Sequence, residues 1–315
     1  MDELDLAAAI EHLVDELRAK ARALTRRGAV IGVSGGVDSA VCAALAVRAF
    51  PVDRVRLLHL PDQDTGPDST KLAEKLATSL GCDLRTQDIT AALRGLDVYD
   101  ELAARVASVL ERPGADITGW KLVRTDPVAS LPVRWKVAAT LADGSSVVSA
   151  ALRPGDLAYI VARQNQKQQM RASVLYRAAD EEHLLVVGTS NRVEIRTGFF
   201  VRHGDGAGDH FPLRLLFKSE VRSLATELGI DPAIAARPAT TDTFSAAQTQ
   251  REFYFGVDEE PFDHILDGFE RGRPAADVAI AAGVGEDVVA AVYADLTRRQ
   301  PFLRYLLSYA LTEDL

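Results

Sequence analysis

Residues 29–46 contain the feature that most restricts the fold of this 315-residue chain. An apolar run, Ala-Val-Ile-Gly-Val, leads into Ser-Gly-Gly-Val-Asp-Ser at residues 34–39, and a run of small residues follows. This order predicts a buried strand, a glycine turn and the first turn of a helix. Backbone N–H groups at such a turn, together with the helix dipole, form a binding site for an anion such as phosphate.

The side chains of this turn favour a nucleotide phosphate. Ser34 and Ser39 can donate hydroxyl hydrogen bonds, and Asp38 can hold a divalent cation that bridges phosphate oxygens. No Gly-Lys-Ser/Thr follows the glycines, so the turn is not a Walker A loop. It resembles the pyrophosphate loop of the N-type ATP pyrophosphatases, which split ATP into AMP and pyrophosphate. The alternative is an ordinary strand-to-helix turn with two glycines.

The composition is typical of a globular protein and disfavours two classes of partner. Hydrophobic residues make up 47% of the chain and charged residues 26%. The formal charge of -9 disfavours a nucleic-acid partner. The acidic start has no apolar signal core, and no run is long enough to span a membrane. We therefore expect a cytoplasmic protein that acts on small molecules, with neither a nucleic-acid nor a membrane partner.

Helical and strand patterns alternate along the first third of the chain. The expected elements are a helix at 5–26, a strand at 29–33, a helix at 39–49, a strand at 55–60, a helix at 69–80, a strand near 83–88 and a helix at 99–110. This alternation predicts an α/β fold with a doubly wound parallel sheet, whose ligands bind at the carboxyl ends of the strands. Further on, we expect a helix at 163–180, a buried strand at 184–189, a helix at 217–228, an irregular segment at 231–262 and a helical C-terminus at 262–270, 274–282 and 285–298.

Residues from about 114 to 155 interrupt this alternation. Strand-like stretches occur at 120–124, 133–137 and 146–148, with an Asp-Gly hairpin signal at 143–144. The stretch is too short for a core of its own, so we expect a small β insert within a single domain that covers residues 1–315. Two roles remain open for it, a surface hairpin or a lid that forms a wall for the acceptor.

The second half of the chain adds residues suited to the same site. Residues 188–194, Gly-Thr-Ser-Asn-Arg-Val-Glu, follow the buried strand, whose end should lie beside the first loop. Asp38 and Glu194 could then hold one Mg²⁺ from two sides, although Glu194 alone could simply begin a helix. Lys218 is expected to begin a helix, where a cation opposes the dipole and a phosphate partner would explain it.

These segments together resemble the ammonia-dependent NAD⁺ synthases. The resemblance depends on the order and spacing of residues 187–191, Glu194, 197–200, 204–206, Asp209 and Pro212, and it covers roughly 1–98 and 160–300. It implies a Rossmann-like fold of the adenine nucleotide alpha hydrolase type. In this family, ATP adenylates the nicotinate carboxylate of deamido-NAD⁺, and ammonia then displaces AMP.

The resemblance also implies a role for particular residues. Asp38, Lys218 and Asp209 would be catalytic, and Asp38 and Glu194 would hold Mg²⁺. The ATP site would comprise Ser34, Gly35, Gly36, Val37, Asp38, Ser39, Leu60, Thr189, Lys218 and Thr240. The acceptor would contact Gln169, Arg171, Arg202, Asp205 and Asp209. Because family members form dimers, we also expect a homodimer.

The acceptor side departs from the family pattern. The family has an arginine where this chain has Gln169, and a His-Lys pair near the C-terminus where residues 296–301 read Leu-Thr-Arg-Arg-Gln-Pro. Arg202 keeps the charge of a family lysine, and Arg171 or Arg298 could replace the lost contacts. We therefore expect an ATP- and Mg²⁺-dependent ligase that amidates a carboxylate other than that of deamido-NAD⁺. A genuine NAD⁺ synthase is the alternative.

Two other functions fit less well. An adenylating sulfurtransferase would need a sulfur-carrying cysteine at the site, and Cys42 and Cys82 are poorly placed. A catalytically silent nucleotide-binding protein would not need the whole set of Asp38, Glu194 and Lys218. No segment carries the cysteine nucleophile of a glutaminase, so we expect free ammonia as the nitrogen source, or ammonia from a separate glutaminase.

Overall fold

A parallel sheet forms the centre of the computed structural model, which describes residues 4–124, 134–241 and 243–308. Its four strands run in the order β3-β2-β1-β7. Their bounds are β1 Ala29–Gly32, β2 Val55–His59, β3 Leu84–Thr86 and β7 Leu185–Val187. In the central register Ile31 of β1 pairs with Leu57 on one side and Val187 on the other. The parallel α/β fold predicted from the alternation is confirmed.

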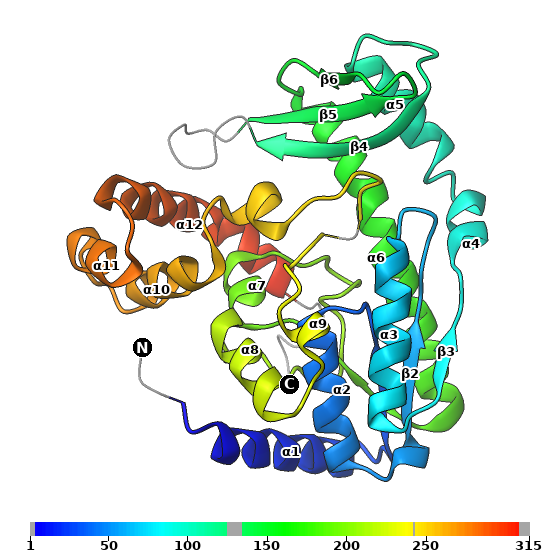
Figure 1. The fold of residues 1–315 in the computed structure, drawn as a ribbon, viewed down its shortest axis with the longest axis vertical. Coiled ribbons are helices and arrows are strands. Elements are labelled where there is room, and N and C mark those ends of the chain that lie inside the picture. Colours follow the sequence, from blue (N-terminus) through cyan, green and yellow to red (C-terminus); the bar gives the residue numbers. More distant parts are fainter. Residues whose placement is uncertain (1–3, 125–133, 242, 309–315) are drawn as a thin grey trace.

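Helices cover both faces of this sheet (Figure 1). Side chains alternate between the faces, so Ile31 and Val187 belong to one buried cluster and Val30 and Val186 to another. The first cluster is covered by α1 (Leu6–Ala23), α2 (Val37–Ala49), α3 (Pro67–Leu80) and α8 (Lys218–Glu227). The second is covered by α4 (Thr90–Gly95) and the long α6 (Pro154–Glu182). Burial on both faces explains why β1 and β7 read as unbroken apolar runs.

The β insert is a separate antiparallel sheet in the order β4-β5-β6. Its strands are β4 Ile117–Arg124, β5 Trp135–Leu141 and β6 Ser146–Val148, so they lie within the range predicted for the insert. Part of the strand expected at 133–137 lies outside the described residues. The buried face of the insert packs on α5 (Asp100–Val109) and on Ile160 of α6. The insert therefore shares its apolar cluster with the helices beneath it.

The C-terminal region is helical, as predicted. It contains α10 (Glu259–Glu270), α11 (Ala275–Ala282) and α12 (Glu286–Leu307), which pack around a cluster of their own. The segment expected to be irregular also contains α9 (Pro232–Ala235) and the π-helical turn η2 (Arg251–Phe255). Two more short elements precede these, the 3-10 turn η1 (Val52–Arg54) and α7 (Arg192–Thr197). None of the described helices is both long and apolar enough to cross a lipid bilayer.

Helices α2 and α3 begin two residues before their predicted starts, and α6 and α12 exceed their predicted ranges by more. Helix α6 begins at Pro154 rather than at 163, because proline at the first helical position needs no N–H partner. Helix α12 continues to Leu307 through Pro301, a residue that usually ends a helix. Beyond that proline Leu303 and Leu306 are buried. Their burial offsets the hydrogen bond that the proline cannot make.

Lys167 ties α6 to two loops at the edge of the sheet. Its side chain is fully buried (0% exposed), and its ammonium group bonds to the Asp64 carboxylate and, at 2.9 Å, to the Thr243 carbonyl. The Asp62 carboxylate lies 3.8 Å away and also binds Arg171 at 3.0 Å. A buried lysine of this kind is stable only because its charge is compensated.

We predict that Lys167→Met lowers the free energy of unfolding by about 3 kcal/mol, because it leaves the Asp64 carboxylate without its cation. Urea denaturation followed by circular dichroism measures the change. The matched control is Lys71→Met, which removes an exposed pair with Asp68 and should cost less than about 1 kcal/mol. Equal effects of the two substitutions would contradict the structural role of Lys167.

Candidate active site

The glycine turn between β1 and α2 has the shape expected of an anion site. Gly35 has a φ of 79°, and a Cβ atom there would lie 2.7 Å from the Ser69 carbonyl oxygen, so only glycine fits. The Ser39 hydroxyl donates to the Gly36 carbonyl (3.0 Å), which fixes the turn onto the helix. Gly36 occupies the N-cap position and provides no side-chain cap for the N–H groups of α2. The turn is thus preformed for an anion at the helix N-terminus.

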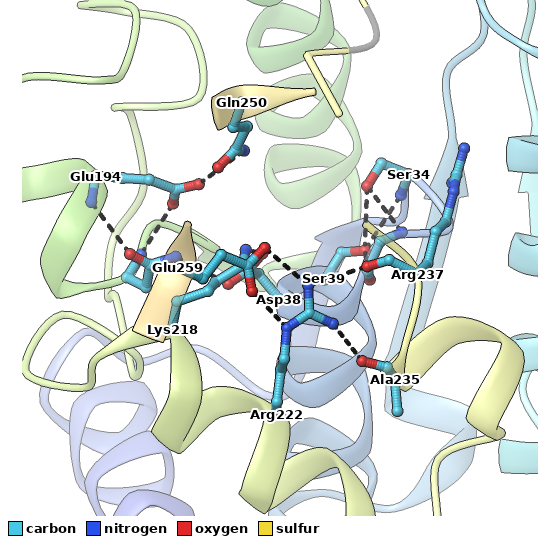
Figure 2. Close-up of polar contacts among 12 residues, drawn as sticks. Ser34, Asp38, Ser39, Glu194, Lys218, Arg222, Ala235, Arg237, Gln250 and Glu259 are labelled. Atoms are coloured by element: carbon cyan, nitrogen blue, oxygen red, sulfur yellow. Dashed lines mark hydrogen bonds and ion pairs between the residues drawn. The ribbon is translucent and has the colours of Figure 1, made fainter. Parts of the chain in front are cut away.

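A buried ion pair connects this turn to α8. The Lys218 ammonium contacts one oxygen of Asp38, and the Asn191 amide donates to the other oxygen at 3.0 Å (Figure 2). Burial alone would lower the pKa of Lys218, but the charges of Asp38 and Glu194 raise it above its usual value. Lys218 is therefore a fixed cation beside the turn, and it begins α8 as predicted.

Glu194 lies in the first turn of α7, and its charge acts on Lys218 of the ion pair. It forms a capping box with Asn191, whose side chain accepts from the Glu194 N–H (3.1 Å) while Glu194 accepts from the Asn191 N–H (3.1 Å). Its other oxygen lies 3.4 Å from the Gln250 amide (Figure 2). Burial and the negative charge of Asp38 raise the pKa of Glu194. The interpretation of Glu194 as a helix-start carboxylate is confirmed, and its predicted role as a ligand of Mg²⁺ stays a prediction.

The two carboxylates form a donor set that fits Mg²⁺. Hard oxygen ligands suit this ion, which usually takes one or two protein carboxylates and fills its other positions with water and phosphate oxygens. The described part of the chain contains no cluster of three or more His, Cys, Asp or Glu side chains. Asp38 and Glu194 therefore fit an ion shared with a nucleotide better than a closed structural metal site.

A cavity of about 840 Å³ opens at the carboxyl ends of β1, β2 and β7. It brings together residues predicted from distant parts of the sequence. Its lining includes Ser34, Gly36, Val37, Asp38, Ser39, Leu60, Thr189, Glu194, Lys218 and Thr240 on the nucleotide side, and Gln169, Arg171, Arg202 and Asp205 on the acceptor side. Gly35 and Asp209, predicted for the same site, are not part of this lining.

Asp209 has a structural contact that the sequence did not indicate. Its carboxylate accepts the N–H of Val186 at 2.8 Å, and its own N–H donates to the Val186 carbonyl at 2.8 Å. It thereby fixes the glycine-rich loop to β7. The nearby Asp205 does line the cavity, where burial raises its pKa to about 6. Of these two carboxylates, Asp205 is the better placed to meet a ligand.

The acceptor side contains two of the expected arginines. Arg171 bonds to the Leu60 carbonyl at 2.9 Å and to Asp62, and its Nη1 is buried without a hydrogen-bond partner among the described residues. The Arg202 guanidinium lies 4.9 Å from the centre of the Tyr305 ring. Arg298, the other candidate replacement, binds Asp295 at 2.7 Å and does not line the cavity.

Several residues near the site had no signal in the sequence. Arg237 donates to the Gly35 carbonyl (3.2 Å) and to the Ser69 hydroxyl (3.1 Å), so it supports the turn. Its own carbonyl accepts a hydrogen bond from Arg222 (Figure 2). Leu122 and Trp135 of the β insert line the cavity. A short-range pattern cannot reveal these residues, because their positions depend on long-range packing. Of the two roles left open for the insert, the structure favours a wall of the cavity.

Comparison with known proteins identifies the family of the chain. The model of the NAD synthase family matches residues 9–107 and 137–304. The chain belongs to this family. It is 37% identical to an NH(3)-dependent NAD(+) synthetase of Mesorhizobium japonicum over 319 residues, which cover 99% of both chains. A second relative, the NH(3)-dependent NAD(+) synthetase of Rhizobium meliloti, is 37% identical over 96% of this chain and 91% of its own.

Solved structures share the NAD synthase fold seen here. An NMN synthetase from Francisella tularensis gives a TM-score of 0.67 at 23% identity, covering 99% of this chain and 100% of its own. An NH3-dependent NAD synthetase from Campylobacter jejuni gives a TM-score of 0.64 at 20% identity, covering 97% and 98%. The predicted family and fold are thus confirmed. The chain is an AMP-forming carbon–nitrogen ligase that uses ATP and Mg²⁺.

Asp263 of α10 supports the helix that carries Lys218. Its carboxylate accepts the Ser219 N–H at 2.9 Å and is fully buried. Burial raises the pKa of Asp263 from 3.8 to about 6. The folded state therefore favours the protonated form. The resulting stabilisation is present below about pH 4 and is lost as the pH rises through about 6.

In the wild-type protein, Asp263 lowers the free energy of unfolding as the pH rises from 4 to 8. We predict that Asp263→Asn makes this decrease smaller by about 3 kcal/mol, because the amide keeps the bond to α8 and does not titrate. Urea midpoints across this pH range measure the effect. Asp15→Asn on the exposed face of α1 is the control and should leave the pH profile unchanged. An unchanged profile for Asp263→Asn would refute the assignment.

Proposed function

We propose that this enzyme is an ammonia-dependent NAD⁺ synthase that amidates deamido-NAD⁺. The observation that carries the proposal is the single cavity, whose lining includes both the Asp38–Lys218 pair and the cationic side chains of Arg171 and Arg202. The curated relatives, 37% identical over nearly the whole chain, are named for the same activity. This replaces the expectation of a different acceptor, which rested on the departures from the family pattern.

The residues suggest how the first half-reaction proceeds. An oxygen of the acceptor carboxylate attacks the α-phosphorus of ATP, and the bond to the β-phosphate breaks as pyrophosphate leaves. The N–H groups at the start of α2, the hydroxyls of Ser34 and Ser39 and the Lys218 ammonium would stabilise the charge on that leaving group. Mg²⁺ held by Asp38 and Glu194 would supply further charge neutralisation on the phosphate oxygens.

The second half-reaction needs positioning rather than a protein nucleophile. Ammonia attacks the acyl carbon, the bond to the AMP oxygen breaks, and the nitrogen loses a proton to give the amide. Asp205 lines the cavity and has a pKa near neutrality, so it is our candidate to accept that proton. We retain Asp209 in an indirect role, since it holds the loop that carries Asp205.

Arg171 supports a phosphate-bearing acceptor. A buried guanidinium normally has all its N–H groups paired, yet Nη1 of Arg171 has no partner among the described residues. A pyrophosphate oxygen of the dinucleotide would satisfy it with a charge-assisted bond. Aromatic side chains of Trp135, Phe253 and Tyr254 form another part of the lining and suit planar rings.

Four expectations from the sequence remain part of this proposal. They are a homodimer, ammonia supplied free or by a separate glutaminase, a cytoplasmic location and a single domain over residues 1–315. The apolar cluster that the insert shares with α5 and α6 supports the single domain.

We predict that AMP forms from ATP, Mg²⁺ and ammonium much faster with deamido-NAD⁺ than with nicotinate mononucleotide. The reason is that the cavity offers a second ring site and the free Arg171 donor for the larger acceptor. Chromatography of AMP and of the amide product measures both rates. Activity with the mononucleotide alone would overturn the assigned acceptor, and no AMP with either would overturn the reaction.

We predict that Asp38→Asn lowers the rate of AMP formation at least about 100-fold, because it removes a metal-binding charge and the partner of Lys218. The amide is close in size to the carboxylate, and a melting curve checks that the variant folds. Asp15→Asn is the matched control and should retain full activity. An Asp38→Asn enzyme with normal rates would refute the metal and phosphate assignment.

A further inference from the structure

Strand β4 lies at the edge of the insert, and its outer side is occupied. An edge strand presents unpaired N–H and C=O groups that need partners. Here the Trp120 N–H donates to the Ser245 hydroxyl (3.0 Å), and the Trp120 carbonyl accepts the Ala246 N–H (3.1 Å). Two residues along, the Leu122 carbonyl accepts the side-chain amide of Gln248 at 2.6 Å. Residues 245–248 therefore satisfy the free edge of β4.

Side-chain contacts on two sides also hold this segment in place. Lys121 of β4 donates to the Ala247 carbonyl at 3.2 Å, and the Trp120 and Phe244 rings pack edge to face with centroids 5.3 Å apart. On the opposite side Lys167 of α6 holds the Thr243 carbonyl at 2.9 Å. The segment that starts at Thr243 is thus held between the insert and α6.

The same segment leads directly to the nucleotide site. Residues 239–241 pair with residues 248–250, through Thr241 N–H to the Gln248 carbonyl (3.1 Å) and Gln250 N–H to the Ala239 carbonyl (2.8 Å). We call residues 239–241 and 243–250 the ribbon. Its base lines the cavity with Thr240 and Thr241, and its Gln250 amide contacts Glu194 (Figure 2).

Gln248 links the two ends of the ribbon. Its backbone carbonyl pairs with Thr241 at the nucleotide site, while its buried side chain binds Leu122 of β4. The family match omits residues 108–136, which contain all of β4. An element outside the matched core therefore makes the contacts that hold a cavity wall.

We propose that β4 is a positioning element of the nucleotide site, which holds the ribbon in place before ATP binds. This inference rests on the proposed ATP-dependent function. When the ribbon is already ordered, ATP binding does not have to supply the free energy of ordering it. If the ribbon were released from β4, the conformation that binds ATP would be only one of several. The apparent affinity for ATP would then fall in proportion to the fraction of molecules in that conformation.

The substitution Gln248→Met tests the proposal. Methionine keeps the length and volume of the side chain but cannot donate to the Leu122 carbonyl. We expect the Kd for Mg²⁺-ATP, measured by calorimetry without acceptor, to rise about tenfold, as for loss of one buried hydrogen bond. The KM for ATP should rise similarly, with kcat and melting temperature near the wild-type values. Hydrogen exchange should increase in the ribbon.

The matched control is Gln300→Met, which removes an amide donor to the Leu296 carbonyl in α12 and should leave the Kd for ATP unchanged. Should Gln248→Met fail to fold, the milder Ser245→Ala removes the acceptor of the Trp120 N–H at an exposed position and should raise the Kd in the same direction. A normal Kd in a folded variant with faster exchange in the ribbon would overturn the positioning role. A wild-type enzyme that fails to bind ATP would instead overturn the proposed function.

Discussion

The ion pair between Asp38 and Lys218 connects parts of the chain that are 180 residues apart. Asp38 lies in the first turn of α2, and Lys218 is the first residue of α8, so the pair fixes two helix N-termini beside one cavity. A buried pair of this kind gains little net stability after desolvation. Within the proposed function the pair serves the ligand, because a nucleotide phosphate would bind Lys218 and a metal ion would bind Asp38. Asn191, the N-cap of α7 just after β7, donates to the Asp38 carboxylate, and the negative charge of Glu194 acts on Lys218.

The local sequence predicted this region well where the same residues set the backbone conformation and carry the polar groups. The strand, the glycine turn and the helix after it were predicted, although the helix begins at Val37 rather than at 39. Lys218 stood out because a cation at a helix start is unfavourable without a partner. The same reasoning was wrong for the length of α12, because only tertiary packing of Leu303 and Leu306 explains why it continues past Pro301.

Long-range contacts set the part of the site that the sequence could not predict. Arg237 supports the turn, yet nothing in its neighbourhood distinguishes it from an ordinary surface arginine. The role assigned to Asp209 assumed a side chain free to meet ammonia, whereas the end of β7 uses that carboxylate for its own N–H group. A sequence motif cannot predict a hydrogen bond of this type, because it gives the residue types but not the backbone groups to which their side chains bond.

The departure at Gln169 leaves a positive charge nearby on the same helix. Residues two apart on a helix do not point the same way, so Arg171 cannot replace an arginine at 169 by simple substitution. In this structure both residues line the cavity, with Gln169 bonded to the Arg202 carbonyl and Arg171 bonded to the Leu60 carbonyl at the end of β2. The positive charge is therefore present but lies nearer the sheet. Under the proposed function, a phosphate of the acceptor would meet Arg171 on this lining, which also includes Trp135 of the insert.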